Sequence, residues 1–234
     1  MTLEISGLSA WYGRARILVD VDIRVERGEA VALLGRNGAG KSTTLKSILG
    51  LVPGRSGRIL FDGVDIAGRP THEIVRRGLG YVPEERRIFT ELSVEENLAV
   101  GRQPPRPGAP TWTAQRLYGL FPNLAALRRR LGGLMSGGEQ QMLAIARTLM
   151  GNPSLVMLDE PSEGLAPLIV EQMAEAIQVM KREGLTVLLS EQNLRFARLI
   201  SDRACIIEKG CIRYEGSMTE LERNPHIRDA YLAL

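Results

Sequence analysis

The sequence lacks the features of an exported or membrane-spanning chain. Its apolar residues come in short runs such as Ala30–Leu34, whereas a membrane-spanning helix needs about 20 consecutive apolar residues. The N-terminal stretch Met1–Ile5 does not place a basic segment before a long apolar one, which excludes a typical export signal. We therefore expect a protein of the cytoplasm.

Cysteine is also scarce, with two residues in the chain. Cys205 and Cys211 flank Lys209-Gly210, a pair typical of a hairpin turn. A two-residue turn places Cys205 closer to Tyr214 than to Cys211. We therefore expect two free thiols, as in a reducing compartment.

Charge is nearly balanced, with a formal net charge of +3 and a pI of about 9.1. The most basic run is Arg128–Arg130. Such a triplet is usually a solvated helix face, the alternative being contact with a partner or with lipid head groups. The sequence contains no motif typical of nucleic-acid binding, and we expect no nucleic-acid partner.

What the sequence does contain is a phosphate-binding loop. Ala30–Leu34 is an apolar, strand-forming run, and Thr44–Leu49 has the pattern of a helix that ends at Gly50. The residues between them fit G-x-x-x-x-G-K-[ST], whose glycines let backbone N–H groups and the positive helix end face an anion. Lys41 adds a charge for the β- and γ-phosphates, and the Ser42 hydroxyl can ligate Mg²⁺. The predicted nucleotide ligands are Gly35, Arg36, Asn37, Gly38, Ala39, Gly40, Lys41, Ser42 and Thr43.

Two acids end a second apolar strand. Ser154–Leu158 is followed directly by Asp159 and Glu160. In phosphate-loop ATPases, one acid at this position holds Mg²⁺, in this case through water. The other acid orients and deprotonates the attacking water. We assign Asp159 to the metal and Glu160 to catalysis; the alternative is a solvated acidic turn.

A glycine pair opens a helix at Ser136–Gly138. Ser136 and Glu139 match a capping box, which is the simple structural interpretation. Two glycines in the first turn weaken a helix, but they leave backbone N–H groups at its positive end open to an anion. A second phosphate-binding helix end makes sense if it binds the phosphate held by another subunit.

Short apolar strands alternate with helices along the chain, a pattern that predicts a parallel sheet covered on both faces. Proline is too dense between Gly101 and Pro110 for regular structure. Residues 87–150 are otherwise helical and separate 1–86 from 151–234, both rich in strands. The strands are predicted at 2–8, 21–26, 30–34, 58–61, 79–82, 154–158, 186–190, 203–208 and 211–215, and the helices at 44–49, 71–77, 91–99, 113–121, 139–150, 168–182 and 218–223.

The segment Leu134–Gln140 resembles the signature sequence of ABC transporter ATPases. It stands between the phosphate loop and Asp159-Glu160, in that family's order, and the resemblance covers essentially the whole chain. It implies one ATPase domain, 1–234, with an α/β fold. Its parts would be a phosphate-loop core with a mixed or parallel sheet, an N-terminal antiparallel β-subdomain and an inserted helical subdomain.

The family resemblance also implies how ATP is held. Tyr12 matches the aromatic residue that stacks on adenine, the alternative being an ordinary tyrosine, and Ser162–Leu165 matches the D-loop. The family forms a head-to-tail dimer with two ATP molecules between the subunits. Each ATP would lie between Gly35–Thr43 of one subunit and Ser136, Gly137 and Gly138 of the other.

Two positions depart from the family pattern. Glu84 stands where the family usually has the Q-loop glutamine, and its carboxylate oxygen allows contact with Mg²⁺. Gln192 stands where the family usually has the switch histidine. Its amide can donate to the γ-phosphate but cannot titrate. We assign Gln192 to catalysis together with Lys41 and Glu160.

These departures, with Pro161–Pro167 and the closing stretch Ala230–Leu234, resemble the ATP-binding subunits of branched-chain (hydrophobic) amino-acid importers. The resemblance implies membrane permease subunits as partners, met by residues 84–112, and a periplasmic solute-binding protein reached only indirectly. It also implies a second ABC ATPase, which is either this chain or, as is usual in the subgroup, a sister chain. The chain would then be peripheral on the inner face of the cell membrane.

Other functions stay open at this stage. Similar ATPases serve importers of urea or short amides. Lipopolysaccharide-export ATPases also look similar but would be expected to keep the glutamine and the histidine. A soluble ABC clamp acting on DNA or ribosomes usually carries a second nucleotide module or long coiled-coil insertions, and a phosphate-loop kinase or GTPase would leave the signature helix unexplained.

Overall fold

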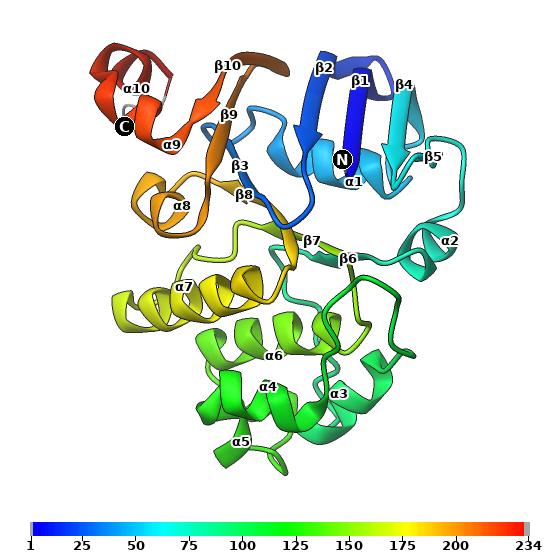
Figure 1. The fold of residues 1–234 in the computed structure, drawn as a ribbon, viewed down its shortest axis with the longest axis vertical. Coiled ribbons are helices and arrows are strands. Elements are labelled where there is room, and N and C mark those ends of the chain that lie inside the picture. Colours follow the sequence, from blue (N-terminus) through cyan, green and yellow to red (C-terminus); the bar gives the residue numbers. More distant parts are fainter. Residues whose placement is uncertain (1, 232–234) are drawn as a thin grey trace.

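A six-stranded sheet forms the centre of the computed structural model, which describes residues 2–231 (Figure 1). The strand order is β10-β9-β3-β8-β7-β6, and only the pairing of β10 with β9 is antiparallel. The predicted α/β fold with a mixed sheet is confirmed. The strands are β3 (Ala30–Leu34), β6 (Leu79–Val82), β7 (Leu155–Asp159), β8 (Thr186–Glu191), β9 (Arg203–Glu208) and β10 (Cys211–Ser217).

The N-terminal region forms a second, antiparallel sheet in the order β2-β1-β4-β5. Its strands are longer than the sequence predicted, and the last was missed: β1 (Leu3–Tyr12), β2 (Ala15–Val25), β4 (Gly54–Phe61) and β5 (Val64–Asp65). Strand β1 shifts register between Ile5 and Leu8, where Gly7 has a φ of 60°. This bulge breaks the alternation of polar and apolar residues, so the sequence pattern ends early although the strand continues.

Helix α1 (Lys41–Ile48) packs against β7 and β8 of the central sheet and against β1 and β2 of the antiparallel sheet. Strand β3 is buried over its whole length. Val31 and Leu33 belong to the apolar core around α1, whereas Ala32 and Leu34 belong to the core on the opposite face. Packing on both faces therefore fixes the phosphate loop, which leaves the carboxyl end of β3.

The other helices lie against both faces and one end of the central sheet, and α3 to α6 gather far from the antiparallel sheet (Figure 1). The capping box predicted at Ser136 is confirmed at the start of α6, and Ser93 forms a second one with Glu96 at the start of α3. The helices are α2 (Thr71–Arg76), α3 (Val94–Gly101), α4 (Ala114–Leu120), α5 (Pro122–Ala126), α6 (Gly137–Leu149), α7 (Pro167–Arg182), α8 (Leu194–Ile200), α9 (Met218–Arg223), α10 (Pro225–Tyr231) and the 3₁₀ turn η1 (Gly132–Leu134).

Four of these elements were not predicted: α5, η1, α8 and α10. All four are at most two turns long and carry little of the repeated apolar spacing that identifies a helix in a sequence, although α2 and α9 are as short and were predicted. Of the closing stretch Ala230–Leu234, residues 232–234 lie outside the described range. Between residues 2 and 231, no helix has the length and apolar character needed to cross a membrane.

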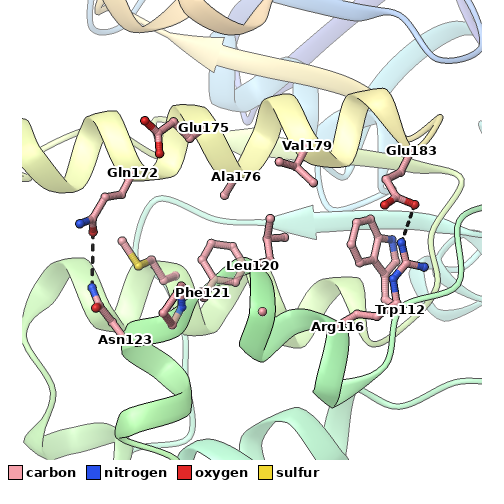
Figure 2. A pocket seen from close by; sticks show the side chains of 13 residues that line it. Trp112, Arg116, Leu120, Phe121, Asn123, Gln172, Glu175, Ala176, Val179 and Glu183 are labelled. Carbon is pink, nitrogen blue, oxygen red and sulfur yellow. Dashed lines mark hydrogen bonds and ion pairs between the residues drawn. The ribbon is translucent and has the colours of Figure 1, made fainter.

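A hollow of about 650 Å³ separates α7 from α4 and α5 (Figure 2). At one end the Asn123 amide donates to Gln172 Oε1 at 3.4 Å, and at the other Arg116 forms an ion pair with Glu183. Apolar residues lie between these two bridges, among them Leu120, Phe121 and Val179. The bridges tie the helical region to α7, and no predicted nucleotide ligand is among the described residues that line the hollow.

The two cysteines are free, as predicted. The turn Lys209-Gly210 has positive φ at both residues, as the expected hairpin requires. A register shift in β10 places Cys205 opposite Glu215, the residue after Tyr214, so Cys205 lies closer to Tyr214 than to Cys211, as predicted. Burial raises the pKa of the Cys205 thiol to about 12, which makes it a poor nucleophile at neutral pH.

Candidate active site

The predicted phosphate loop connects the carboxyl end of β3 to the first turn of α1. Gly38 and Gly40 have φ values of 78° and 116°, in the region that favours glycine. Gly40 is the N-cap of α1 and supplies no side-chain acceptor. The helix therefore begins at Lys41, before the predicted Thr44, and its first N–H groups remain available to an anion.

The loop is held tightly on the side away from the cavity. A Cβ atom at Gly35 would lie 2.4 Å from the Ile207 carbonyl oxygen, and one at Gly40 would lie 2.8 Å from Leu18 Cδ2. On the other side a cavity of about 420 Å³ opens. Its lining includes the predicted catalytic residue Glu160 and eight of the predicted nucleotide and metal ligands: Tyr12, Asn37, Gly38, Gly40, Lys41, Ser42, Thr43 and Glu84.

Lys41 and Glu160 form a buried ion pair at 2.9 Å. The Lys41 ammonium also donates to the carbonyl oxygens of Gly35 and Arg36, at 2.7 and 3.1 Å. The second oxygen of Glu160 accepts from the Gln192 backbone N–H at 3.2 Å. A buried cation aimed at the loop suits phosphate oxygens, which can compete with these acceptors for its protons.

Glu160 has left-handed backbone geometry, with a φ of 48°. Its own N–H donates to the Ser190 carbonyl oxygen at 2.9 Å, across to the end of β8. Non-glycine residues in this conformation are often found at functional sites, where surrounding contacts hold the strain. The contacts with Ser190, Gln192 and Lys41 therefore fix the direction of the Glu160 carboxylate.

Asp159 is the last residue of β7 rather than the first residue after it, and it is buried. One carboxylate oxygen accepts from the Ser42 hydroxyl at 2.9 Å, and the other accepts from the Tyr81 hydroxyl at 3.0 Å. The structure thus brings together Ser42 and Asp159, which are both predicted metal ligands. Tyr81 was not a predicted site residue, because only the pairing of β6 with β7 brings it near Asp159.

Glu84 is exposed and lines the same cavity as Ser42. Partial burial raises the pKa of its carboxyl above the ordinary value, and the nearby carboxylates of Glu163 and Asp159 raise it further. Such a group of carboxylates repels itself and attracts a cation. The position of Glu84 is therefore compatible with the predicted contact to Mg²⁺.

Gln192 follows β8 directly and lines a neighbouring cavity of about 690 Å³, together with Asn37 and Glu160. Strand β8 runs one residue further than predicted and ends at Glu191, which is buried. Glu191 was not predicted as a site residue. Its carboxylate accepts backbone N–H groups from Ser162 at 3.1 Å, Gln192 at 3.0 Å and Asn193 at 2.9 Å. Glu191 therefore links the Gln192 segment to the segment that follows Glu160.

The Ser136–Gly138 helix end lies apart from the loop of its own chain. Ser136 is exposed, and its hydroxyl and Glu139 form both halves of the capping box. Among the described residues that line the cavity of the phosphate loop, none belongs to Ser136–Gly138. Neighbours crowd both glycines: a Cβ atom at Gly137 would lie 2.9 Å from Arg86 Nη1, and one at Gly138 would lie 2.7 Å from Ile169 Cγ2.

Replacement of Glu191 should destabilise the fold. Glu191→Ala leaves the backbone N–H groups of Ser162 and Asn193 without their acceptor, whereas Gln192 keeps its bond to Glu160. We expect the free energy of unfolding to fall by about 2–4 kcal/mol. Urea denaturation of wild type and variant measures this loss. Glu175→Ala, which removes an exposed acid from α7, is the control and should change the value by less than about 0.5 kcal/mol. An equally small effect for Glu191→Ala would show that the contacts do not stabilise the fold.

The same residue predicts a pH dependence. Burial raises the pKa of the Glu191 carboxyl above its ordinary 4.5, and Glu160 adds to the rise, whereas the hydrogen bonds from Ser162 and Asn193 oppose it. A raised folded-state pKa stabilises the fold below pH 4.5, and that stability is lost as pH rises through the folded pKa. Glu191→Gln has no such titration, so its unfolding free energy relative to wild type should rise between pH 4 and 7.

Three comparisons relate this chain to known proteins. The family model described as "ABC transporter" matches residues 18–163. The high-affinity branched-chain amino acid transport ATP-binding protein BraG of Pseudomonas aeruginosa is 44% identical over 98% of this chain and 99% of its own. The lipopolysaccharide export system ATP-binding protein LptB of Escherichia coli is 36% identical over 99% and 97%. A solved structure of an ATP binding subunit of an ABC transporter aligns with a TM-score of 0.80 and 32% identity, over 99% of this chain and 96% of that one.

Proposed function

This chain belongs to the ABC transporter family, and we propose that it is the ATP-hydrolysing subunit of an importer for branched-chain or other hydrophobic amino acids. Its high identity to BraG over nearly the full length of both chains carries the choice of solute. LptB is less similar. Glu84 and Gln192, which replace the usual glutamine and histidine, also support the importer subgroup.

The residues of the cavity have distinct roles in this function. The loop amides and Lys41 bind the phosphates of ATP, and Tyr12, 47% exposed at the rim, stacks on the adenine. Glu160 orients the attacking water and takes its proton. The Gln192 amide donates to the γ-phosphate. The Gln192 amide does not titrate, so the hydrolysis rate should not depend on the protonation of a histidine at this position.

The donor set also fits Mg²⁺. The Ser42 hydroxyl and the Asp159 carboxylate offer oxygen ligands, which Mg²⁺ prefers, 2.9 Å apart. Glu84 adds a further carboxylate at the cavity. Within residues 2–231 no group of three or more His, Cys, Asp and Glu residues could hold a metal, so phosphate oxygens would complete the site. When bound, the ion neutralises charge that develops on the phosphates.

We infer that two ATPase subunits act together, because the helix end at Ser136–Gly138 and the phosphate loop Gly35–Thr43 are separate within one chain. Head-to-tail association would bring each helix end to the ATP bound by the other subunit. The partner is a sister ATPase or a second copy of this chain. ATP binding would close the dimer, and hydrolysis would open it again.

A groove beside β6 suits the permease. It has a volume of about 850 Å³. Four large apolar side chains in its lining are between 44% and 54% exposed: Leu51, Val75, Phe89 and Val100. A gathered apolar surface of this kind marks a contact with another protein. Phe89 and Val100 lie in the segment 84–112, which the sequence analysis assigned to the permease.

This assignment places the chain at the cytoplasmic face of the cell membrane, held there by the permease subunits. The solute-binding protein would act through the permease rather than by touching this chain. The alternatives are an importer of urea or short amides, a lipopolysaccharide exporter and a soluble clamp on DNA or ribosomes.

Phe89→Glu should lower recovery of the permease from detergent extracts by about tenfold, because a charge in an apolar contact costs more than 1.4 kcal/mol. In proteoliposomes with the binding protein, leucine should stimulate ATP hydrolysis by the wild-type complex but not by the Phe89→Glu complex. Leu199→Glu is the control, because Leu199 has a similar exposure, 43%, outside the groove. Stimulation by urea or acetamide alone would contradict the amino-acid assignment. Recovery with DNA or ribosomes alone would contradict transport.

A further inference from the structure

Tyr81 connects two parts of the molecule that the proposed function treats separately. It belongs to β6, the edge strand of the central sheet, and it lines the groove beside that strand. Its hydroxyl donates to Asp159 Oδ2 at 3.0 Å. The same residue therefore contacts both the surface suited to the permease and the carboxylate suited to Mg²⁺.

The geometry of β6 and β7 makes this connection direct. Tyr81 pairs with Met157 in the parallel register, and Asp159 follows two residues further along β7. Side chains two residues apart lie on the same face of a strand. The Tyr81 side chain therefore reaches Asp159 on the directly neighbouring strand, on the same face of the sheet.

The contact defines the direction of the Asp159 carboxylate. Ser42 donates to Oδ1 and Tyr81 donates to Oδ2, so the two donors restrain both oxygens. Burial, followed by the charge of Asp159 itself, raises the pKa of the Tyr81 phenol. The phenol therefore remains a protonated donor throughout the neutral range.

The phenol is also close to the segment that follows β6. The carboxylate of Glu85 raises its pKa and the guanidinium of Arg87 lowers it. Arg87 Nε and Glu85 Oε2 form an ion pair at 3.6 Å. A movement of Glu85 or Arg87 would therefore change the charges around the phenol.

We propose that Tyr81 is a positioning residue that couples occupancy of the groove to the Asp159 metal site. It does not touch the reacting atoms. Tyr81 lines the groove that a permease would occupy, and its hydroxyl orients the carboxylate that would hold the ion. The coupling to a permease rests on the proposed function, whereas the hold on Asp159 rests on the contacts of this chain alone.

The first test uses the isolated full chain with ADP and Mn²⁺, whose binding is measured by electron paramagnetic resonance. Tyr81→Phe keeps the ring and removes the hydroxyl. It should weaken Mn²⁺ binding about ten- to a hundredfold, as expected when a metal ligand loses the hydrogen bond that orients it. Tyr118→Phe removes another half-buried hydroxyl, on α4, and should leave Mn²⁺ binding unchanged. Equal Mn²⁺ affinity of Tyr81→Phe and wild type would overturn the hold on Asp159.

The second test adds the permease. In the wild type, assembly with the permease should change the Mg²⁺ concentration that gives half-maximal ATP hydrolysis. In Tyr81→Phe, this concentration should be the same with and without the permease. A variant that responds as strongly as the wild type would overturn the coupling. If the wild-type chain captures no permease, the proposed function and the coupling fail together, but the Mn²⁺ measurement still decides whether Tyr81 holds Asp159.

Discussion

Glu160→Gln should retain ATP binding and lower turnover about a hundred- to ten-thousandfold, the usual contribution of a general base. The amide preserves the shape of the side chain and can still accept from the Gln192 N–H, but it cannot take a proton from water. It also removes the 2.9 Å ion pair with Lys41, which leaves the ammonium free for phosphate. We therefore expect ATP affinity to be retained or increased.

The measurements are steady-state hydrolysis and gel filtration with ATP and Mg²⁺. The variant should elute as a dimer that persists, because hydrolysis no longer opens it. Glu163→Gln is the matched control. Glu163 lines the same cavity but is exposed, and it lies further along the chain from the end of β7 than Glu160 does. Its effect on turnover should be far smaller. Native turnover of Glu160→Gln would contradict its assignment as the base.

Ser136→Arg should leave one ATP bound per chain but abolish the ATP-dependent dimer, with turnover reduced about a hundredfold or more, as expected when transition-state donors are lost. Ser136 is exposed at the start of α6, so a long side chain there obstructs an approaching subunit. It also adds a cation near the Arg86 guanidinium, which already lies against Gly137.

The chain offers a close control for this substitution. Ser217 starts α9 with the same capping box, completed by Glu220, so Ser217→Arg loses a comparable cap, a cost of about 1 kcal/mol. It should still dimerise with ATP. Both variants are best compared by sedimentation in the Glu160→Gln background, where the dimer persists. Hydrolysis by Ser136→Arg at the wild-type rate would mean that this end is only a capped helix.

The sequence by itself determined the phosphate loop, the acidic strand end and the capped helix at Ser136. Each is contiguous, and each depends on local chemistry: glycine at positive φ, an apolar run that ends in acids, and a serine that caps three residues before a glutamate. The order of these motifs along the chain was enough to predict the family, the α/β fold and the residues assigned to ATP.

Only the tertiary structure decided which distant side chains meet these motifs. Tyr81 reaches Asp159 because β6 pairs with β7, and Glu191 reaches Ser162 because β8 pairs with the other side of β7. Nothing in the linear sequence states which parallel strands become neighbours, since any two could be joined through a crossover helix. Long-range pairing selects those contacts through burial and hydrogen bonding over the whole sheet, and a local pattern of residues cannot encode it.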